Sequence, residues 1–278
     1  MKKLFATAAL TAATLMSGAA QAGDVVKFAT EGAYPPWNAL NSAGELEGFE
    51  IDLYKDLCAR AKLECTMQQT AWEGIIPSLK AKKFDVIMAG MSITDKRKKQ
   101  ITFSRSYASS PAVFVISKSS SMADFKVSAE KISLNDLDDA EAAGLKATLA
   151  LLKGKSIGVQ KGTIHLNFLK EYLKDDATIR TYATQEELDL DLQSGRVDVA
   201  FAAMSYWHPL FQKPEGKDFL AIGPGFSEGP FGEGVGLGLR KKDQELAEKL
   251  SAAINSAIAD GTVSKIATKW FGFDASTK

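Results

Sequence analysis

The chain has 278 residues, of which 45% are hydrophobic and 24% are charged, so it can form one large or two modest cores. Lysine plus arginine and aspartate plus glutamate number 34 each, which makes the formal net charge zero. This balance gives no electrostatic reason to expect nucleic acid or an anionic membrane as the main partner.

The N-terminus has the pattern of a secretory signal. A basic start at Lys2 and Lys3 precedes an apolar, small-residue run to Met16, and "AQA" at 20–22 fits a cleavage site. We predict a signal peptide over residues 1–22. The alternative, a membrane anchor, is disfavoured because the run is short and rich in alanine. We therefore expect an exported, soluble protein.

Short β-rich runs alternate with helical patterns along the rest of the chain. Strands are expected at 25–30, 84–90 and 155–160, and helices at 49–63, 72–83, 162–174 and 246–258, with a break at Asp260 and Gly261 before a last helix begins. Such alternation predicts an α/β fold of right-handed βαβ units on mostly parallel sheets.

One segment resembles another further along the chain. Residues 79–92 ("LKAKKFDVIMAGMS") align without gaps on residues 192–205 ("LQSGRVDVAFAAMS"). Chance matching of common α/β sequence is one interpretation. The other is two lobes with related units, each ending in Met-Ser at the carboxyl edge of a sheet, where open α/β sheets bind ligands. Residues 118–153, between the repeats, are interpreted as a surface insertion on the second lobe.

Cys58 and Cys65 lie at the end of an expected helix and the start of the next apolar run. In an oxidising compartment a helix-to-strand disulfide is expected, with two buried thiols as the alternative. We expect no metal site, because neither His165 nor His208 lies near these cysteines in the sequence.

No catalytic motif is evident. The chain contains no H-E-x-x-H and no P-loop, and the alternating glycines of "GEGVGLG" at 232–238 suit a strand better than a phosphate-binding turn. Two histidines offer little material for acid–base chemistry near neutral pH. We expect neither an enzyme nor a cofactor.

Two groups of residues suggest a receptor for a small zwitterion. Glu31 follows the first strand, and the aromatic residues Tyr34, Trp37 and Trp72 come after it. Aromatic rings beside a carboxylate can enclose a planar cation such as guanidinium. The alternative is that these rings only cap a core.

The second group is the stretch "SITDKR", residues 92–97. Cations at the start of a helix oppose its dipole, which suggests that an anion binds there. Backbone N–H groups near Ser92 and Thr94, with the guanidinium of Arg97, would form a carboxylate clamp. We interpret Lys96, Lys98 and Lys99 as solvated side chains.

These residues carry a family resemblance. The stretches "ATEGAYPPW", "GFEIDLYKDLC", "WEGIIPSLKAKKFDVIMAGMSITDKR", "GVQKGT", "LQSGRVDVAFA" and "FGEGVGLGLRKKD" resemble the periplasmic solute-binding proteins of polar amino-acid ABC importers. Within that family the chain resembles the opine-type members, the octopine- and nopaline-binding proteins, followed by lysine/arginine/ornithine- and histidine-binding proteins.

The resemblance implies the type II periplasmic-binding-protein fold, with two lobes that close over ligand. It places lobe 1 at 23–107 and 232–278, lobe 2 at 112–228, and the hinges at about 108–111 and 226–231. It also implies the partners, which are an amino-acid or opine ligand and the subunits of an ABC permease. We expect a monomer that binds no nucleic acid.

The resemblance also assigns roles to individual residues. Glu31 would face the cationic group of the ligand, with Tyr34 and Trp72 packing its stem. The α-carboxylate would bind Arg97 and Ser92. The remaining contacts would come from main-chain groups of the first lobe and from side chains of the second: Ala89, Gly90, Gln160, Thr163 and His165.

One position departs from the family pattern. Amino-acid binders carry an aspartate for the α-ammonium where this chain has Ala203. A buried ammonium without a counter-charge is costly, and opines carry a substituted amine and an extra carboxylate instead. This favours an arginine-derived opine, although Ser205 or Glu31 could replace the missing acid. Ser92 is a further, weak indication of an octopine-like ligand.

Two other functions are compatible with the same fold. A few proteins that share it are cyclohexadienyl-type dehydratases, but the cleft expected here would hold one carboxylate, Glu31, and one histidine, His165. An extracellular sensor domain would need a transmembrane segment or a partner domain. The binding protein of an importer is the leading hypothesis.

Overall fold

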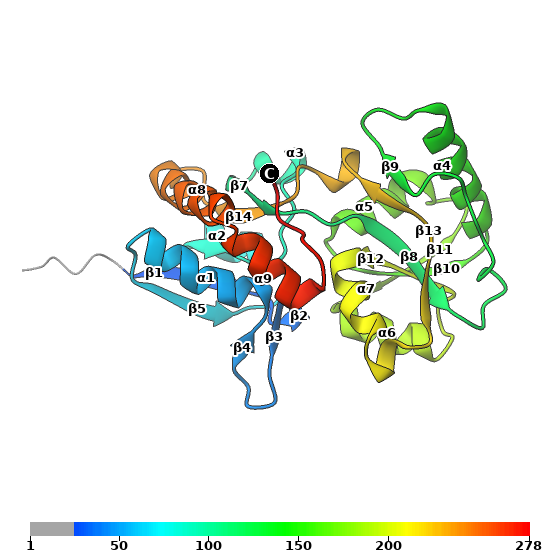
Figure 1. The fold of residues 1–278 in the computed structure, drawn as a ribbon, viewed down its shortest axis with the longest axis horizontal. Helices are drawn as coiled ribbons and strands as arrows, with labels where there is room; N and C mark the ends of the chain where they lie inside the picture. The colour runs from blue at the N-terminus through cyan, green and yellow to red at the C-terminus, as the bar shows by residue number, and fades with distance from the viewer. Residues whose placement is uncertain (1–24) are drawn as a thin grey trace, which may run out of the picture.

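The computed structural model describes residues 25–278, and the predicted signal peptide lies outside them. Two sheets form separate bodies that lie side by side (Figure 1). We call each sheet, with the helices packed on it, a lobe. The chain passes to the second lobe after β7 and returns after β13, so that the C-terminal helices α8 and α9 pack on the first lobe (Figure 1).

The first lobe contains a five-stranded sheet with the order β5-β1-β6-β14-β7. Strands β5 and β6 both run parallel to β1, while β14 is antiparallel to β6 and to β7. The strands are β1 (Val26–Thr30), β5 (Cys65–Gln69), β6 (Val86–Ile87), β7 (Thr102–Ala108) and β14 (Val235–Leu239). A small antiparallel sheet precedes the first helix, from β2 (Ala33–Tyr34), β3 (Asn38–Leu40) and β4 (Leu46–Glu47).

The helices of this lobe bury apolar faces against that sheet. In α8, Leu250, Ile254 and Ala257 recur at helical spacing and are fully buried beside Leu53 and Leu57 of α1. Gly48 precedes α1 at φ 128°, where an added Cβ would meet the Trp37 carbonyl oxygen at 2.5 Å. The helices are α1 (Phe49–Arg60), α2 (Ile75–Lys80), α3 (Asp95–Lys98), α8 (Gln244–Ala259) and α9 (Thr262–Phe271).

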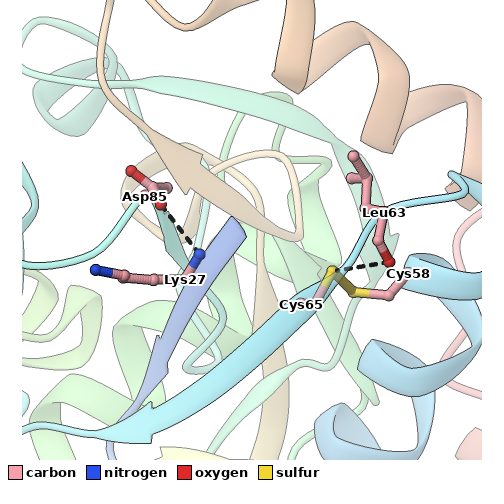
Figure 2. The surroundings of a disulfide bond; sticks show 5 residues. All are labelled: Lys27, Cys58, Leu63, Cys65 and Asp85. Atoms are coloured by element: carbon pink, nitrogen blue, oxygen red, sulfur yellow. Dashed lines mark hydrogen bonds between the residues drawn. A yellow bond between two sulfur atoms is a disulfide. The ribbon is translucent and has the colours of Figure 1, made fainter. Parts of the chain in front are cut away.

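The predicted disulfide is present. Cys58 of α1 bonds Cys65, the first residue of β5, with their Cα atoms 6.3 Å apart (Figure 2). In the same region the Lys27 N–H of β1 donates to Asp85, just before β6, at 3.0 Å (Figure 2). The disulfide links α1 to β5, and the hydrogen bond links β1 to the start of β6. Both lie at the end of the lobe away from the carboxyl ends of its parallel strands.

The second lobe contains a six-stranded sheet with the order β11-β10-β12-β8-β13-β9. Its strands are β8 (Ala112–Ser117), β9 (Lys131–Ser133), β10 (Ser156–Gln160), β11 (Thr178–Tyr182), β12 (Val199–Ala203) and β13 (Phe219–Ser227). Its helices are α4 (Asp139–Leu152), α5 (Ile164–Tyr172), α6 (Gln185–Gln193) and α7 (Met204–Phe211), and two 3₁₀ turns, η1 (Pro214–Gly216) and η2 (Gly229–Phe231), follow.

The segment predicted to be a surface insertion is more integral than expected. Strand β9 pairs with the edge of β13, and Ile132 within it is fully buried. Helix α4 buries Thr148 and Leu152 against this lobe and begins with a capping box at Asp138. Part of residues 118–153 therefore completes the second sheet and its core.

Candidate functional site

A cavity lies between the two lobes, at the carboxyl ends of β1, β6 and β10. All the predicted ligand residues line it except Ala203 and Ser205. Its lining comprises Glu31, Tyr34, Trp72, Ala89, Gly90, Ser92 and Arg97 from the first lobe, and Gln160, Thr163, Ile164, His165 and Gln185 from the second.

A second cavity adjoins the first on the side of the two crossings between lobes. The two cavities share Tyr34, Gly90, Ser92, Ile164 and His165. The second cavity extends to residues of the crossings and to the end of β12, which are Ser109, Ser110, Ser227, Glu228 and Ala203. Ala203 is therefore at the site, but in this adjoining part of it.

Ser205 lies outside both cavities and is fully buried. Its backbone N–H donates to the Ser110 hydroxyl at 2.9 Å, and its own hydroxyl accepts a 3.0 Å hydrogen bond from the Trp37 indole of the first lobe. The expectation that Ser205 could replace the missing acid at the ligand is therefore wrong for its side chain, which joins the two lobes instead. Trp37 has both of the roles considered for the aromatic residues. It packs in the core on Phe49 and Phe271, and it also lines the adjoining cavity.

Arg97 is the cation of the cavity. It lies in the single turn α3, which Thr94 caps by accepting from the Arg97 N–H, and it is 9% exposed. Its guanidinium donates to the Ser92 carbonyl oxygen at 2.9 Å and, across the cleft, to the Gly162 carbonyl oxygen at 3.3 Å. Two of its five N–H donors are thus used, which leaves donors for a carboxylate. Burial lowers its pKa to about 10, so the group is cationic at neutral pH.

Glu31 is the carboxylate of the cavity. It follows β1, is 6% exposed, and accepts a 2.7 Å hydrogen bond from the Gln160 amide of the second lobe. Burial is the main cause that raises the pKa of Glu31 to about 7; the negative charges of Glu50 and Glu186 add to this rise, and the Gln160 hydrogen bond opposes it. A cation placed beside Glu31 would restore its ionised form.

The aromatic residues lie across the cleft from the second lobe. The Trp72 indole donates to the Lys161 carbonyl oxygen at 3.0 Å, and its ring centroid is 5.3 Å from Cζ of Arg97. Tyr34 stacks on Tyr206 with ring centroids 5.1 Å apart. With the Gln160–Glu31 and Arg97–Gly162 bonds, these contacts hold the lobes in a closed arrangement.

The second lobe presents neutral groups to the cavity. The Thr163 hydroxyl caps α5 by accepting from the Leu166 N–H at 3.2 Å, and it donates to the Gln160 carbonyl oxygen at 2.8 Å. Burial, together with the Arg97 charge, lowers the pKa of His165 to about 3. The imidazole is therefore neutral at pH 7 and lies against Phe201 and Phe231.

Two lining residues were not predicted from the sequence. Gln185 opens α6 directly after β11, is 1% exposed, and donates to Asp189 at 3.1 Å. Ile164 is the first residue of α5. Their positions follow from the same rule as the others, since each opens the helix that follows a strand of the parallel part of the sheet after a short turn.

Residues 25–278 contain no group of side chains placed to hold a metal ion and no helix long and apolar enough to cross a membrane. Residues 26–273 match the bacterial extracellular solute-binding proteins, family 3. The chain belongs to that family. It is a periplasmic solute-binding protein and not an enzyme, so the dehydratase alternative loses support.

Relatives of known specificity cover nearly the whole solute-binding chain. The octopine-binding periplasmic protein of Rhizobium meliloti is 40% identical over 90% of each chain. The histidine-binding periplasmic protein of Salmonella typhimurium is 36% identical over 99% of this chain and 98% of its own. Among solved structures, an ancestral arginine-binding protein bound to arginine has a TM-score of 0.74 and 30% identity, over 89% of this chain and 98% of that one.

A lysine complex of a His/Glu/Gln/Arg/opine-family binding protein from Silicibacter pomeroyi has a TM-score of 0.70 and 33% identity. It covers 91% of this chain and 100% of that chain. The mixed α/β fold with two sheets of mostly parallel strands is therefore the periplasmic-binding-protein fold that the sequence predicts.

Proposed function

We propose that this protein binds an arginine-derived opine, of the octopine type, or a basic amino acid between its lobes. One observation carries the proposal: Glu31 and Arg97, a buried carboxylate and a buried guanidinium, line the same interlobe cavity. A zwitterion with a distal cation satisfies both charges, whereas either buried charge left alone would be costly. The relatives are named as octopine-, histidine- and arginine-binding proteins, which agrees with this chemistry.

The proposed arrangement places the α-carboxylate of the ligand on Arg97 and the N–H groups around Ser92. Its cationic end would lie at Glu31, with Gln160 and Gln185 beside it and Tyr34 and Trp72 against its stem. The remaining predicted contacts are Ala89, Gly90, Thr163 and His165, which line the same cavity.

An opine is favoured because of the adjoining cavity. An amino-acid ligand would leave its α-ammonium near Ala203, which carries no charge, and the adjoining cavity beyond it is lined by Ser109 and Ser110. An N-substituted amino acid would place its extra group there. This interpretation extends the sequence argument from Ala203. Alanine is smaller than the aspartate of the family pattern, so the difference leaves space as well as removing a charge.

In this proposal the lobes close about the two crossings, residues 108–111 and 226–231, and a monomer delivers the ligand to the permease of an ABC importer. Closure would exclude water from the two buried charges, which strengthens their interactions with the ligand.

A thermal-shift screen followed by calorimetry tests the proposal. Octopine, nopaline, arginine, lysine, ornithine and histidine are compared, and a ligand at 100 times its Kd stabilises the folded state by about 2.7 kcal/mol. We expect the largest shift with octopine or arginine. A flat response to all six ligands would show that the assigned ligand class is wrong.

Replacement of Ala203 by aspartate separates the two ligand types. We expect Ala203→Asp to change the ratio of arginine to octopine affinity at least about tenfold in favour of arginine, or about 1.4 kcal/mol, because the new carboxylate pairs with a free α-ammonium. Ala203→Asn is the matched uncharged control. An unchanged ratio in Ala203→Asp would remove the argument for an opine.

A further inference from the structure

Glu50 is a fully buried carboxylate behind the ligand cavity, and none of the contacts proposed above uses it. It is the second residue of α1, in the "GFEIDLYKDLC" stretch. Its Oε1 accepts from the Gly90 N–H at 2.8 Å and from the Tyr107 hydroxyl, and its Oε2 accepts from the Asn38 amide at 2.7 Å. All three donors are neutral, which is unusual for a buried charge.

These hydrogen bonds reach both loops that carry the first lobe's ligand groups. Gly90 itself lines the cavity, two residues before Ser92. Asn38 in turn accepts from the Gly32 N–H at 2.8 Å, and Gly32 is the residue after Glu31. Both glycines have left-handed backbones, with φ of 69° at Gly32 and 59° at Gly90, so the bonds hold these turns in conformations that few other residues adopt.

The network is complete within the first lobe. Gly32, Asn38, Glu50, Gly90 and Tyr107 belong to that lobe, and no bond of the network crosses the cleft. None of these bonds requires the second lobe, so the network can organise these turns before the lobes close. Such preorganisation lowers the cost of ordering the site on binding.

Glu50 also acts on the charge of the cavity. The negative charge of Glu50 raises the pKa values of three ionisable groups, which are Glu31, Tyr34 and Tyr107. Its own pKa is raised to about 7 by burial, against the lowering effect of its three hydrogen bonds. An ionised Glu50 thus adds negative potential where the ligand cation would bind, and it makes Glu31 harder to ionise without that cation.

We propose that Glu50 is a positioning residue for cation recognition: its carboxylate fixes the Glu31–Gly32 turn and the Gly90 turn from behind, and its protonation weakens binding of a cationic ligand. The proposal rests on the proposed function for its ligand, but the network itself makes a prediction that needs no ligand.

The ligand-free test follows the backbone amide of Gly90 by NMR from about pH 5 to about pH 9. We expect its resonance to titrate with a midpoint near 7 in the wild type and in Glu31→Gln, and not to titrate in Glu50→Gln. The charge-matched control is Glu47→Gln, an exposed site at the end of β4, which should titrate as the wild type does. A Gly90 amide that does not titrate, or that still titrates in Glu50→Gln, overturns the proposal.

The ligand test measures arginine affinity over the same pH range. In Glu50→Gln we expect affinity at pH 8 to fall about tenfold, and the midpoint of its pH dependence to move lower, because Glu31 no longer faces a second negative charge. Tyr107→Phe keeps the carboxylate but removes a donor that lowers its pKa, so here the midpoint should move higher.

A merely structural role would lower the melting temperature of both variants and leave the two midpoints at the wild-type value, and that result would overturn the proposal. If Glu50→Gln does not fold, Tyr107→Phe carries the test. If arginine does not bind the wild type, the proposed function is in error, while the Gly90 titration still decides the role of Glu50.

Discussion

The two lobes share the arrangement of five strands, to which the second sheet adds β9 at its edge, but they contribute different chemistry to the cleft. In the first sheet β1 pairs in parallel with β5 and β6, and β14 is antiparallel to β6. In the second, β10 pairs in parallel with β11 and β12, and β8 is antiparallel to β12. The repeated sequences at 79–92 and 192–205 cover β6 and β12, which hold equivalent places in the two sheets.

The lobes differ in the residues directly after the equivalent strands. After β1 comes Glu31, whereas after β10 comes a turn whose only charge, on the exposed Lys161, lies outside the cavity lining, and which ends at Thr163, the N-cap of α5. After β6 the chain forms a loop that leads to Arg97, whereas after β12 helix α7 begins at once at Met204. The first lobe therefore provides both charges of the cavity, and the second provides neutral donors and acceptors with a neutral His165.

This division implies an order of events. A zwitterion can satisfy both of its charges on the open first lobe, and the second lobe then closes through uncharged groups of its own. A hydrogen bond between neutral groups is worth about 0.5–1.5 kcal/mol, and one to a charged group about 1.5–3 kcal/mol. Variants of the first lobe should therefore affect the ligand's affinity strongly, and variants of the second lobe should mainly affect closure. Single substitutions in each lobe test this contrast.

The largest effect is expected at Arg97. Arg97→Ala removes the buried guanidinium proposed to bind the carboxylate, and we expect affinity to fall at least about a hundredfold, or about 2.8 kcal/mol. Calorimetry with octopine and arginine measures it. Lys96→Ala, an exposed cation in the same short helix, is the control and should bind normally. Unchanged affinity in Arg97→Ala would rule out the carboxylate clamp.

Glu31 should show a smaller and more selective effect. Glu31→Gln keeps the size of the side chain but removes the charge facing the cation, so we expect about a tenfold to hundredfold loss for arginine and a smaller loss for a neutral ligand such as glutamine. Glu64→Gln, at an exposed position, is the control. If arginine and glutamine lose affinity equally, Glu31 does not select for charge.

How much of this site the sequence reveals depends on the kind of contact. Glu31 and Arg97 were predictable because each follows a strand and each carries a charge that needs an opposite charge beside it. The strand-end rule applies equally to Gln185, but its helix shows only an ordinary amphipathic pattern, and a neutral amide carries no such signal.

Contacts between distant parts of the chain were not predictable. Glu50 stands within an amphipathic helix pattern, and only the fold brings Asn38, Gly90 and Tyr107 to its carboxylate. Ser205 was expected at the ligand because it ends a repeated Met-Ser, but α7 begins one residue earlier and turns it toward Trp37. Strand β9 has three residues with a single apolar side chain, Ile132, which is too short a pattern to predict a strand.

In the second lobe we expect Gln160→Ala to have a moderate effect. It removes the amide that donates to Glu31 at 2.7 Å and to the Ala183 carbonyl oxygen at 3.1 Å. Loss of a hydrogen bond to a charged group costs about 1.5–3 kcal/mol, so affinity should fall about tenfold to a hundredfold at most, mainly through faster dissociation. Stopped-flow fluorescence separates the rates. A purely slower association would contradict a role in closure.

The smallest effect expected is on the pH dependence of stability without ligand. Burial raises the pKa of Glu31 and Glu50 in the first lobe, and of Asp189 in the second, to about 7. Their folded pKa values exceed the unfolded ones, so the folded state binds more protons at intermediate pH. The stability that these groups contribute is complete below about pH 4 and is lost as the pH rises through about 7.

We therefore expect the melting temperature of the ligand-free protein to fall between about pH 5 and about pH 8. Carboxylates with lowered pKa values, such as Asp260 at about 2, act in the opposite sense but only at lower pH. Asp189→Asn should flatten the curve in part, and Glu50→Gln should do so independently, because the two acids lie in different lobes. A melting temperature that rises across this range would show that these carboxyl groups are not held in their neutral form by the fold.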